Sequence, residues 1–342
     1  MKAVRFHEYG GPDRLVYEEV PAPVPGEGEL RIRVRACAIN RVDLDLRSGV
    51  ARFPLNLPHI LGTEVAGDIE SIGASVSGLG LGDRVTSLHV INCGTCEYCN
   101  SGNENICDRM GMTGVTMPGG YAEYLVVPAW TVIPLPSTLT YAQACCIQST
   151  FGTVWHALVS RARITQSDKV LVNAAGSGVG TAAIQVAKSI GAYVIASAGS
   201  PNKLEKARQL GADAVVNYRE QNLAESVREL TGGRGVDVVM ECVGGQIFEA
   251  SLAALAKNGR LVTVGGHAGE VVKLDVISFF RKQLSLVGSA RATAAEYRKV
   301  IEMVGIGDLH PVIDRTYPLR EASAAHTRME GRSNVGRLVL LP

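Results

Sequence analysis

The sequence predicts a two-domain α/β protein that combines a β-rich part with a doubly wound parallel sheet. In the first third, residues 30–36 alternate apolar and basic side chains, which is typical of a half-buried strand. After about residue 150, short apolar strands alternate with helical stretches, and this rhythm indicates crossover connections in a parallel sheet. The chain has 342 residues, which is enough for two ordinary domains.

The order of the expected elements sets the domain boundaries. In the β-rich part we expect strands at 30–36, 64–73 and 122–127, and a last strand at 337–341. In the second part we expect strands at 169–175, 193–198, 214–217, 236–241, 260–264 and 284–289, with helices at 178–190 and 202–210 among the helical stretches between them. We therefore assign residues 1–149 and 290–342 to one domain and residues 150–289 to the other.

Composition excludes several classes of function. The formal net charge is 34 minus 33, or +1, so nothing marks a nucleic-acid partner or an acidic membrane surface. No apolar run approaches the roughly 18 residues of a membrane-spanning helix, so we expect no membrane partner. The N-terminal segment lacks the apolar core of a signal peptide, and we expect a cytoplasmic protein.

A glycine-rich turn joins the first parallel strand to its helix. Gly176, Gly178 and Gly180 would let the backbone approach a pyrophosphate, whose charge the helix N-terminus favours. Ser177 and Val179 lie in the same loop. A tight turn without a ligand remains the alternative, but the place between strand and helix predicts dinucleotide binding.

The end of the second parallel strand indicates which dinucleotide binds. An NAD enzyme usually places Asp or Glu about 20 residues after the glycines, where it bonds the ribose hydroxyls. Here residues 197–203 contain no acid, and Ser200 and Lys203 could bind a 2′-phosphate. We therefore expect NADPH in preference to NADH. Alternatively, the two side chains cap and solvate the next helix.

Four of the eight cysteines crowd into one short lobe, at about residues 92–108. Cys93, Cys96, Cys99 and Cys107 are separated by two, two and seven residues, and four thiolates in a compact loop suit tetrahedral zinc. A site closed by four protein ligands is structural. An iron–sulfur cluster is the rival interpretation, but no proline follows the fourth cysteine.

Over essentially its full length the chain resembles the medium-chain dehydrogenase/reductase superfamily. The resemblance rests on residues 62–67, 82–85, 119–124 and 174–180, together with the four-cysteine lobe. It implies a GroES-like catalytic domain interrupted by a Rossmann domain. It also implies a homodimer or homotetramer paired through the strand at 284–289.

The resemblance also locates a departure from the metal-dependent members. Their catalytic zinc is held by Cys, His and Cys, and the matching positions here are Asn40, Thr63 and Ser149. Amide and hydroxyl groups hold zinc poorly. Residues 40–49 and 174–180 resemble the quinone oxidoreductase branch, although Asp45 stands where many of its members have Tyr.

These features predict an NADPH-preferring oxidoreductase that transfers hydride to an enone or a quinone without catalytic zinc. Asn40, Thr63 and Ser149 are the candidate hydrogen-bond donors for the oxygen that gains negative charge. An alcohol dehydrogenase or ketone reductase of the zinc-containing type, which acts on alcohols and ketones, is one alternative. A non-catalytic NADPH-binding protein is the other.

Further cofactor contacts are implied by the resemblance. They are a threonine near nicotinamide, residues at the ends of later parallel strands, a tyrosine beside the adenosine and an arginine at the pyrophosphate. The corresponding residues are Thr153, Tyr218, Cys242, Val243, Val264, Gly265, Gly266, Gly288, Ser289 and Arg337.

Overall fold

The computed structural model describes residues 1–51 and 53–342, which divide into two compact units. The first unit contains residues 1–149, 293–306 and 313–342, and the second contains residues 150–292 and 307–312. Residues 290–292 and 307–312 thus lie outside the domain to which the sequence analysis assigned them. For the second segment the reason is Gln185, whose amide accepts from the His310 N–H at 2.8 Å and donates to the His310 carbonyl at 3.0 Å.

The first unit is rich in β structure, as expected. Its strands are β1 (Lys2–Phe6), β2 (Val16–Glu19), β3 (Glu29–Ala38), β4 (His59–Ile60), β5 (Glu64–Ile72), β6 (Arg84–Ser87), β7 (Val90–Ile91), β8 (Gly111–Met112), β9 (Tyr124–Pro128), β10 (Val132–Pro134), β17 (Ile313–Pro318) and β18 (Arg337–Leu341). Its helices are η1 (Pro12–Arg14), α1 (Arg41–Ser48), α2 (Glu97–Asn100), η2 (Glu104–Ile106), η3 (Ala129–Thr131), α3 (Tyr141–Ala144), α9 (Ala294–Gly305), η6 (Leu319–Glu321) and α10 (Ala322–Glu330).

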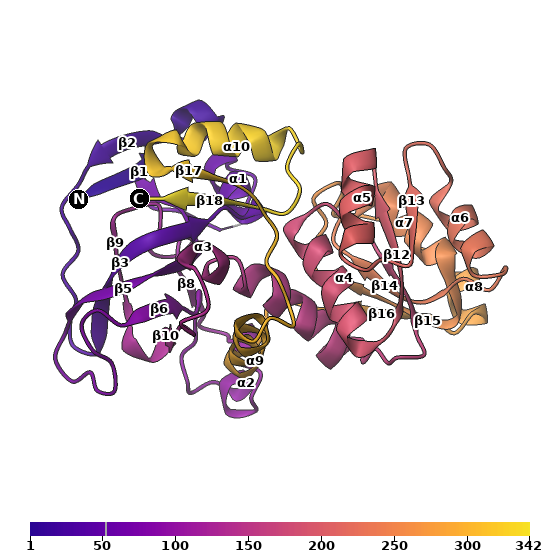
Figure 1. Cartoon of the computed structure of the whole chain (residues 1–342), viewed down its shortest axis with the longest axis horizontal. Coiled ribbons are helices and arrows are strands. Elements are labelled where there is room, and N and C mark those ends of the chain that lie inside the picture. Colours follow the sequence, from indigo (N-terminus) through magenta and orange to yellow (C-terminus); the bar gives the residue numbers. More distant parts are fainter. Residues whose placement is uncertain (52) are drawn as a thin grey trace. The chain divides into compact units, whose positions relative to one another are not determined.

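The main sheet of this unit places the C-terminal strands beside the N-terminal ones. Its order is β10-β6-β5-β3-β18-β17, and β9 also pairs with β3. Figure 1 shows yellow β18 next to indigo β3, with both chain ends in this unit. Strand β18 pairs with β3. Arg337 is the first residue of β18, and β3 ends two residues before Asn40, so both residues belong to the same sheet region.

The alternation in β3 gives the predicted half-buried strand. Leu30, Ile32 and Val34 are buried in the core, because alternate side chains of a strand point to opposite faces. On the other face Arg31 donates to Glu70 and Arg35 donates to Asp68.

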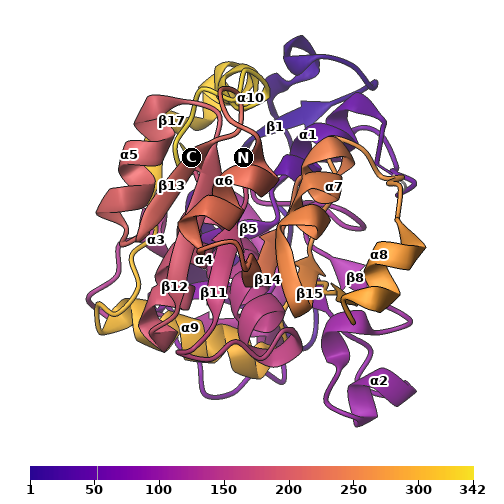
Figure 2. The same cartoon turned by 90° about the vertical axis from the view of Figure 1, so that its right-hand side faces the viewer.

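The second unit is a parallel sheet of six strands. It contains β11 (Lys169–Val172), β12 (Tyr193–Ala198), β13 (Ala214–Asn217), β14 (Val236–Glu241), β15 (Leu255–Thr263) and β16 (Ser285–Gly288). Its helices are η5 (Trp155–Arg161), α4 (Gly178–Ile190), α5 (Pro201–Gln209), α6 (Leu223–Leu230), α7 (Gly245–Ala254) and α8 (Val276–Arg281), and η4 (Gln148–Gly152) lies across the unit boundary. The order β13-β12-β11-β14-β15-β16 can be followed for its first five strands in Figure 2.

This order confirms the doubly wound arrangement. Every pair in the sheet is parallel, and the order reverses between β11 and β14, where a dinucleotide site is expected. The first strand is shorter than predicted, because Ala174 has a left-handed φ of 50° and turns the chain toward α4. Within residues 1–51 and 53–342, no helix has the length and hydropathy required to cross a membrane.

Candidate active site

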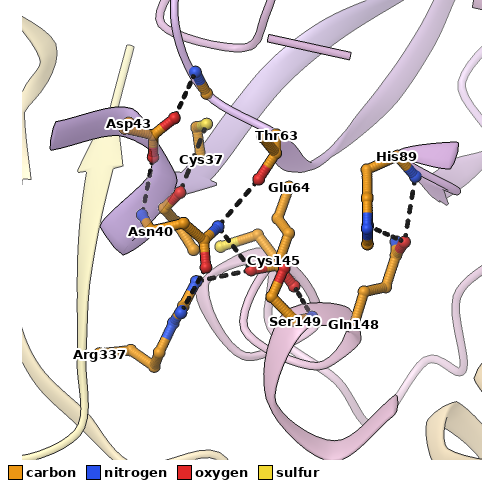
Figure 3. A network of polar contacts seen from close by, with 12 residues as sticks. Cys37, Asn40, Asp43, Thr63, Glu64, His89, Cys145, Gln148, Ser149 and Arg337 are labelled. Carbon is orange, nitrogen blue, oxygen red and sulfur yellow. Dashed lines mark hydrogen bonds and ion pairs between the residues drawn. The ribbon is translucent and has the colours of Figure 1, made fainter. Parts of the chain in front are cut away.

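The three candidate catalytic residues meet in one buried cluster of the first unit. Asn40 directly precedes α1, and Thr63 directly precedes β5. The Asn40 amide nitrogen donates to the Thr63 hydroxyl and to the Glu64 carboxylate, both at 2.9 Å. The Ser149 backbone N–H donates to the other Glu64 oxygen at 2.7 Å. Figure 3 shows the side chains converging around Asn40 and Glu64.

A backbone constraint fixes the position of Thr63. Gly62 has a φ of +101°, and a Cβ at this position would lie 2.5 Å from the Tyr121 ring and 2.7 Å from the Cys37 sulfur. Only glycine tolerates both the left-handed conformation and the close packing. Asp43 holds the same turn, because one of its oxygens accepts from the Gly62 N–H at 3.1 Å.

Arg337 enters the cluster from β18. Its guanidinium donates to the Asn40 side-chain oxygen at 2.7 Å and to Glu64 at 2.6 Å. Burial alone would lower the pKa of the guanidinium, but the Glu64 carboxylate opposes this and raises it, so Arg337 stays charged. We expected Arg337 at the cofactor pyrophosphate. In the structure it pairs with Glu64 and Asn40, because a buried guanidinium requires a partner.

The three candidates differ in what they can still donate. Both hydrogens of the Asn40 amide are already given to Thr63 and Glu64, so Asn40 has no donor left for a substrate. The hydroxyl groups of Thr63 and Ser149 donate no hydrogen bond to any described residue. The cluster therefore offers two hydroxyl donors and one amide that holds them in place.

This cluster does not fit a catalytic zinc. Zinc in proteins is held by cysteine sulfur, histidine nitrogen or carboxylate oxygen. Asn40, Thr63 and Ser149 carry none of these groups, and Glu64 is already paired with Arg337. Burial raises the pKa of the nearby Cys37 and Cys145 thiols well above the usual range, so both are neutral thiols in this structure.

The four cysteines of the lobe do fit a metal. The sulfur atoms of Cys93, Cys96, Cys99 and Cys107 all lie within 4.8 Å of one another. The distance is 3.9 Å from Cys93 to Cys99, 3.5 Å from Cys96 to Cys99 and 3.8 Å from Cys96 to Cys107. Tetrahedral zinc with bonds of about 2.3 Å requires sulfur atoms roughly 3.8 Å apart. Over residues 1–51 and 53–342, no other group of three or more His, Cys, Asp and Glu side chains converges in this way.

Hydrogen-bond donors surround two of the four sulfur atoms of the lobe. The backbone N–H groups of Cys93 and Arg109 donate to the Cys107 sulfur at 3.3 and 3.4 Å. The Arg109 guanidinium lies 3.5 Å from the Cys93 sulfur. These donors stabilise thiolates, as expected around a structural zinc.

The glycine-rich turn of the second unit is built for a close approach. A Cβ at Gly180 would lie 2.2 Å from the Ala174 carbonyl oxygen, and a Cβ at Gly176 would overlap the Lys203 side chain. Ser177 caps α4 by accepting from the Gly180 N–H at 2.9 Å. Gly178 and Val179 form the first turn of that helix. The free N–H groups at this end suit a pyrophosphate.

The end of β12 gathers two cations and a tyrosine. Lys203 on α5 reaches back over Gly176. A Cβ at Gly199 would meet both the Arg219 guanidinium and the Tyr218 hydroxyl at 2.9 Å. The Ser200 hydroxyl donates to Asn202 at 2.7 Å. Arg219 was not predicted from the sequence, although its place next to Tyr218, just after β13, was an available signal.

The remaining expected contacts lie at the carboxyl ends of β14, β15 and β16. Cys242 and Val243 follow β14, and burial raises the pKa of the Cys242 thiol to about 12, so it remains neutral. Residues 264–266 follow β15, and Gly288 and Ser289 lie at the end of β16.

The Ser289 hydroxyl oxygen is buried without a hydrogen-bond partner in the described chain, which suits a ligand contact. Thr153 lies between η4 and η5.

Comparison with known proteins agrees with this architecture. Residues 26–137 match the alcohol dehydrogenase GroES-like domain, and residues 178–305 match the zinc-binding dehydrogenase family. The human quinone oxidoreductase is 31% identical over 350 residues, covering 100% of this chain and 98% of its own length. The chain belongs to the medium-chain dehydrogenase/reductase superfamily.

Other members of the superfamily are equally similar. The NAD-dependent alcohol dehydrogenase of Sulfurisphaera tokodaii is 31% identical over 351 residues, covering all of both chains. A solved structure of an NAD-dependent alcohol dehydrogenase is 39% identical with a TM-score of 0.95, again over all of both chains. The chain is thus an oxidoreductase of this superfamily, and overall similarity does not choose between the two substrate classes.

Proposed function

We propose that this protein is an NAD(P)H-dependent oxidoreductase that transfers hydride to an activated carbon–carbon double bond or to a quinone, without catalytic zinc. The observation that carries the proposal is the donor set of the buried cluster. Asn40, Thr63 and Ser149 stand where metal-dependent relatives are expected to carry their zinc ligands, and an ion pair between Arg337 and Glu64 occupies the same cluster.

In this proposal the nicotinamide cofactor supplies the hydride, and the protein stabilises the charge that follows. Negative charge develops on the substrate oxygen as an enolate or a hydroquinone anion. The Thr63 hydroxyl, with Ser149 as a second candidate, donates a hydrogen bond to that oxygen. An enolate can take its proton from water, so no further acid is required. Reduction of a simple ketone is harder, because its alkoxide is more basic.

NADPH is the proposed cofactor. Lys203 and Arg219 both lie at the end of β12, and the segment that follows this strand contains no acidic side chain. Two cations favour a 2′-phosphate over a free ribose hydroxyl. A structural zinc at the four cysteines completes the proposed complement.

Two other functions are supported by specific observations. The 39% identity with an NAD-dependent alcohol dehydrogenase favours action on alcohols or ketones. The loss of zinc-binding residues from the cluster would also fit an NADPH-binding protein without catalytic activity. A non-catalytic protein would have no use for the buried Thr63 hydroxyl, whose hydrogen no described residue accepts.

The test measures oxidation of NADPH and NADH against a quinone, an enone and a ketone, with zinc counted in the same sample. The proposal expects NADPH-linked turnover of the quinone or enone and about one zinc per chain. Alcohol or ketone turnover with two zinc ions per chain would establish the alcohol dehydrogenase instead. Cofactor binding without turnover of any substrate would favour the non-catalytic protein.

The quaternary state is also a proposal. Strand β16 pairs only with β15 among the described strands, so its other edge is open. Leu286 on this strand is 43% exposed. An open edge that carries an apolar side chain favours pairing with a second copy of the chain, and we propose a homodimer, or a homotetramer built from such dimers.

A further inference from the structure

Arg337 determines which atoms donate and which accept in the hydrogen bonds around Asn40. A guanidinium carries only donors. The Asn40 atom that lies 2.7 Å from Arg337 must therefore be the amide oxygen. The orientation of the Asn40 amide is fixed by the chemistry of its partner, and its nitrogen has to face Thr63 and Glu64.

The direction continues from Asn40 to Thr63. The amide nitrogen can only donate, so the Thr63 hydroxyl accepts at 2.9 Å. The hydrogen of that hydroxyl must then point away from Asn40, and no described residue accepts it. Accepting one hydrogen bond also strengthens the bond that the same hydroxyl donates, because hydrogen bonds in a chain polarise one another.

Both ends of the arrangement are anchored. Glu64 is buried, and its second oxygen accepts from the Ser149 backbone N–H at 2.7 Å. The first oxygen accepts from Arg337 and from Asn40. The guanidinium is therefore held by a carboxylate that cannot rotate away, and Figure 3 shows Asn40 between Arg337 and Thr63.

We propose that Arg337 is a positioning residue for hydride transfer: acting through Asn40, it forces the Thr63 hydroxyl to present its hydrogen to the substrate oxygen. The inference rests on the proposed function and adds the residue that orients the donor. It differs from the contact with the cofactor pyrophosphate that the sequence analysis assigned to Arg337, and the two roles predict different measurements.

The experiment compares Arg337→Met, Asn40→Leu and the double variant in the zinc-loaded protein. Each is assayed for kcat with the substrate that the wild type reduces best, and NADPH affinity is measured by nicotinamide fluorescence. We expect each single variant to lower kcat about 100-fold, the cost of losing one oriented donor. The double variant should be no slower than the slower single variant, because both act on the same hydroxyl. The Kd for NADPH should change less than about twofold, since no cofactor contact is lost.

Two further variants separate positioning from folding. Thr63→Val should match the loss in Asn40→Leu, whereas Thr63→Ser retains the hydroxyl and should keep most of the activity. Arg337→Met leaves the buried Glu64 carboxylate unpaired, and the variant can fail to fold for that reason. In that case the double variant Arg337→Met with Glu64→Gln, which removes both charges, is measured in place of the single variant. Arg328→Met, which breaks the Arg328–Asp314 pair outside the cluster, is the matched control for removing an arginine.

The outcomes distinguish this inference from the proposed function. A rise in the Kd for NADPH of about 10-fold in Arg337→Met with kcat intact would assign Arg337 to the cofactor and overturn the positioning role. Equal losses in Thr63→Ser and Thr63→Val would also overturn it. If the wild type reduces only ketones, the proposed function fails, and the same variants measured with a ketone still judge the role of Arg337. A wild type without turnover overturns both.

Discussion

Asp43 is a fully buried carboxyl group whose surroundings shift its pKa in two opposite directions. Burial raises its pKa, and hydrogen bonds from the backbone N–H groups of Asn40 and Gly62 lower it, with a resulting value of about 7. The Tyr121 hydroxyl also donates to it, at 3.4 Å. This carboxyl group caps the start of helix α1 through the Asn40 N–H and holds the turn before Thr63 through the Gly62 N–H, so its ionisation is linked to the stability of the site.

The raised pKa of Asp43 predicts that the protein loses stability as the pH rises from about 4 to 7. In this window the folded protein keeps a proton that the unfolded chain releases, and each pH unit costs up to about 1.4 kcal/mol. Urea unfolding of the wild type at several pH values should show this loss, and Asp43→Asn should remove that part of the slope. Parallel pH profiles of the two proteins would show that Asp43 ionises normally.

Arg219 is expected to select the cofactor. Replacing it by alanine should raise the KM for NADPH about 10-fold, as expected for one charge-assisted hydrogen bond to a phosphate. The KM for NADH should stay unchanged, because NADH has no 2′-phosphate. Arg208→Ala is the matched control, since Arg208 is exposed on α5 and pairs with Glu205. If Arg219→Ala raised the KM for NADPH and the KM for NADH equally, Arg219 would not bind the 2′-phosphate.

For individual residues, the sequence indicated which side chains lie together in the candidate active site, but not which of them donate and which accept hydrogen bonds. Asn40, Thr63 and Ser149 could be placed together from their resemblance to a metal site. Hydrogen-bond direction could not, because it depends on Arg337, which lies 297 positions from Asn40. The pairing of Arg47 with His326, 279 positions away, was equally hidden.

The zinc lobe shows how one element supports another. Glu104 on η2 accepts from the Ala294 N–H at 2.8 Å, at the first residue of α9. Thr293 already caps this helix by accepting from the Glu296 N–H, so Glu104 satisfies an additional free donor. Since η2 lies between Cys99 and Cys107, a zinc ion bound by the four cysteines would indirectly hold the cap of α9.

Removing the zinc should therefore loosen the first turn of α9. Hydrogen exchange should show faster exchange there after chelation, and Glu104→Ala should produce the same change with the zinc retained. The expected loss is about 1 kcal/mol of local protection, as for other helix caps. Glu104→Gln keeps the acceptor and serves as the control. Unchanged exchange in α9 after chelation would mean that the lobe folds without its metal.

Elements with a strong local pattern were predicted closely, and irregular ones were not. Helix α4 and strands β12, β13, β14 and β18 have the predicted bounds, because apolar periodicity and flanking glycines define them locally. The turns of π-helix in η4 and η5 were not anticipated. Such turns are rare and occur mostly as single turns inside α-helices, so no periodic pattern in the sequence marks them.

For the whole molecule, the open edge of β16 predicts a dimer formed by two parallel-sheet units. Pairing around a twofold axis would join the two sheets and cover Leu286 from both copies. Light scattering after size exclusion should give a multiple of the 36.3 kDa chain mass for the wild type. Leu286→Lys should shift the protein toward a single chain, because a charged side chain at an edge opposes strand pairing.

The matched control is Leu230→Lys, since Leu230 is 41% exposed at the end of α6, on a helix rather than on the sheet edge. This variant should keep the mass of the wild type. A wild type that elutes as a single chain would refute the dimer. An oligomer that survives Leu286→Lys unchanged would place the interface elsewhere. Helix α8 offers another exposed apolar surface of this unit, because Val276, Ile277 and Phe280 are 62%, 57% and 60% exposed.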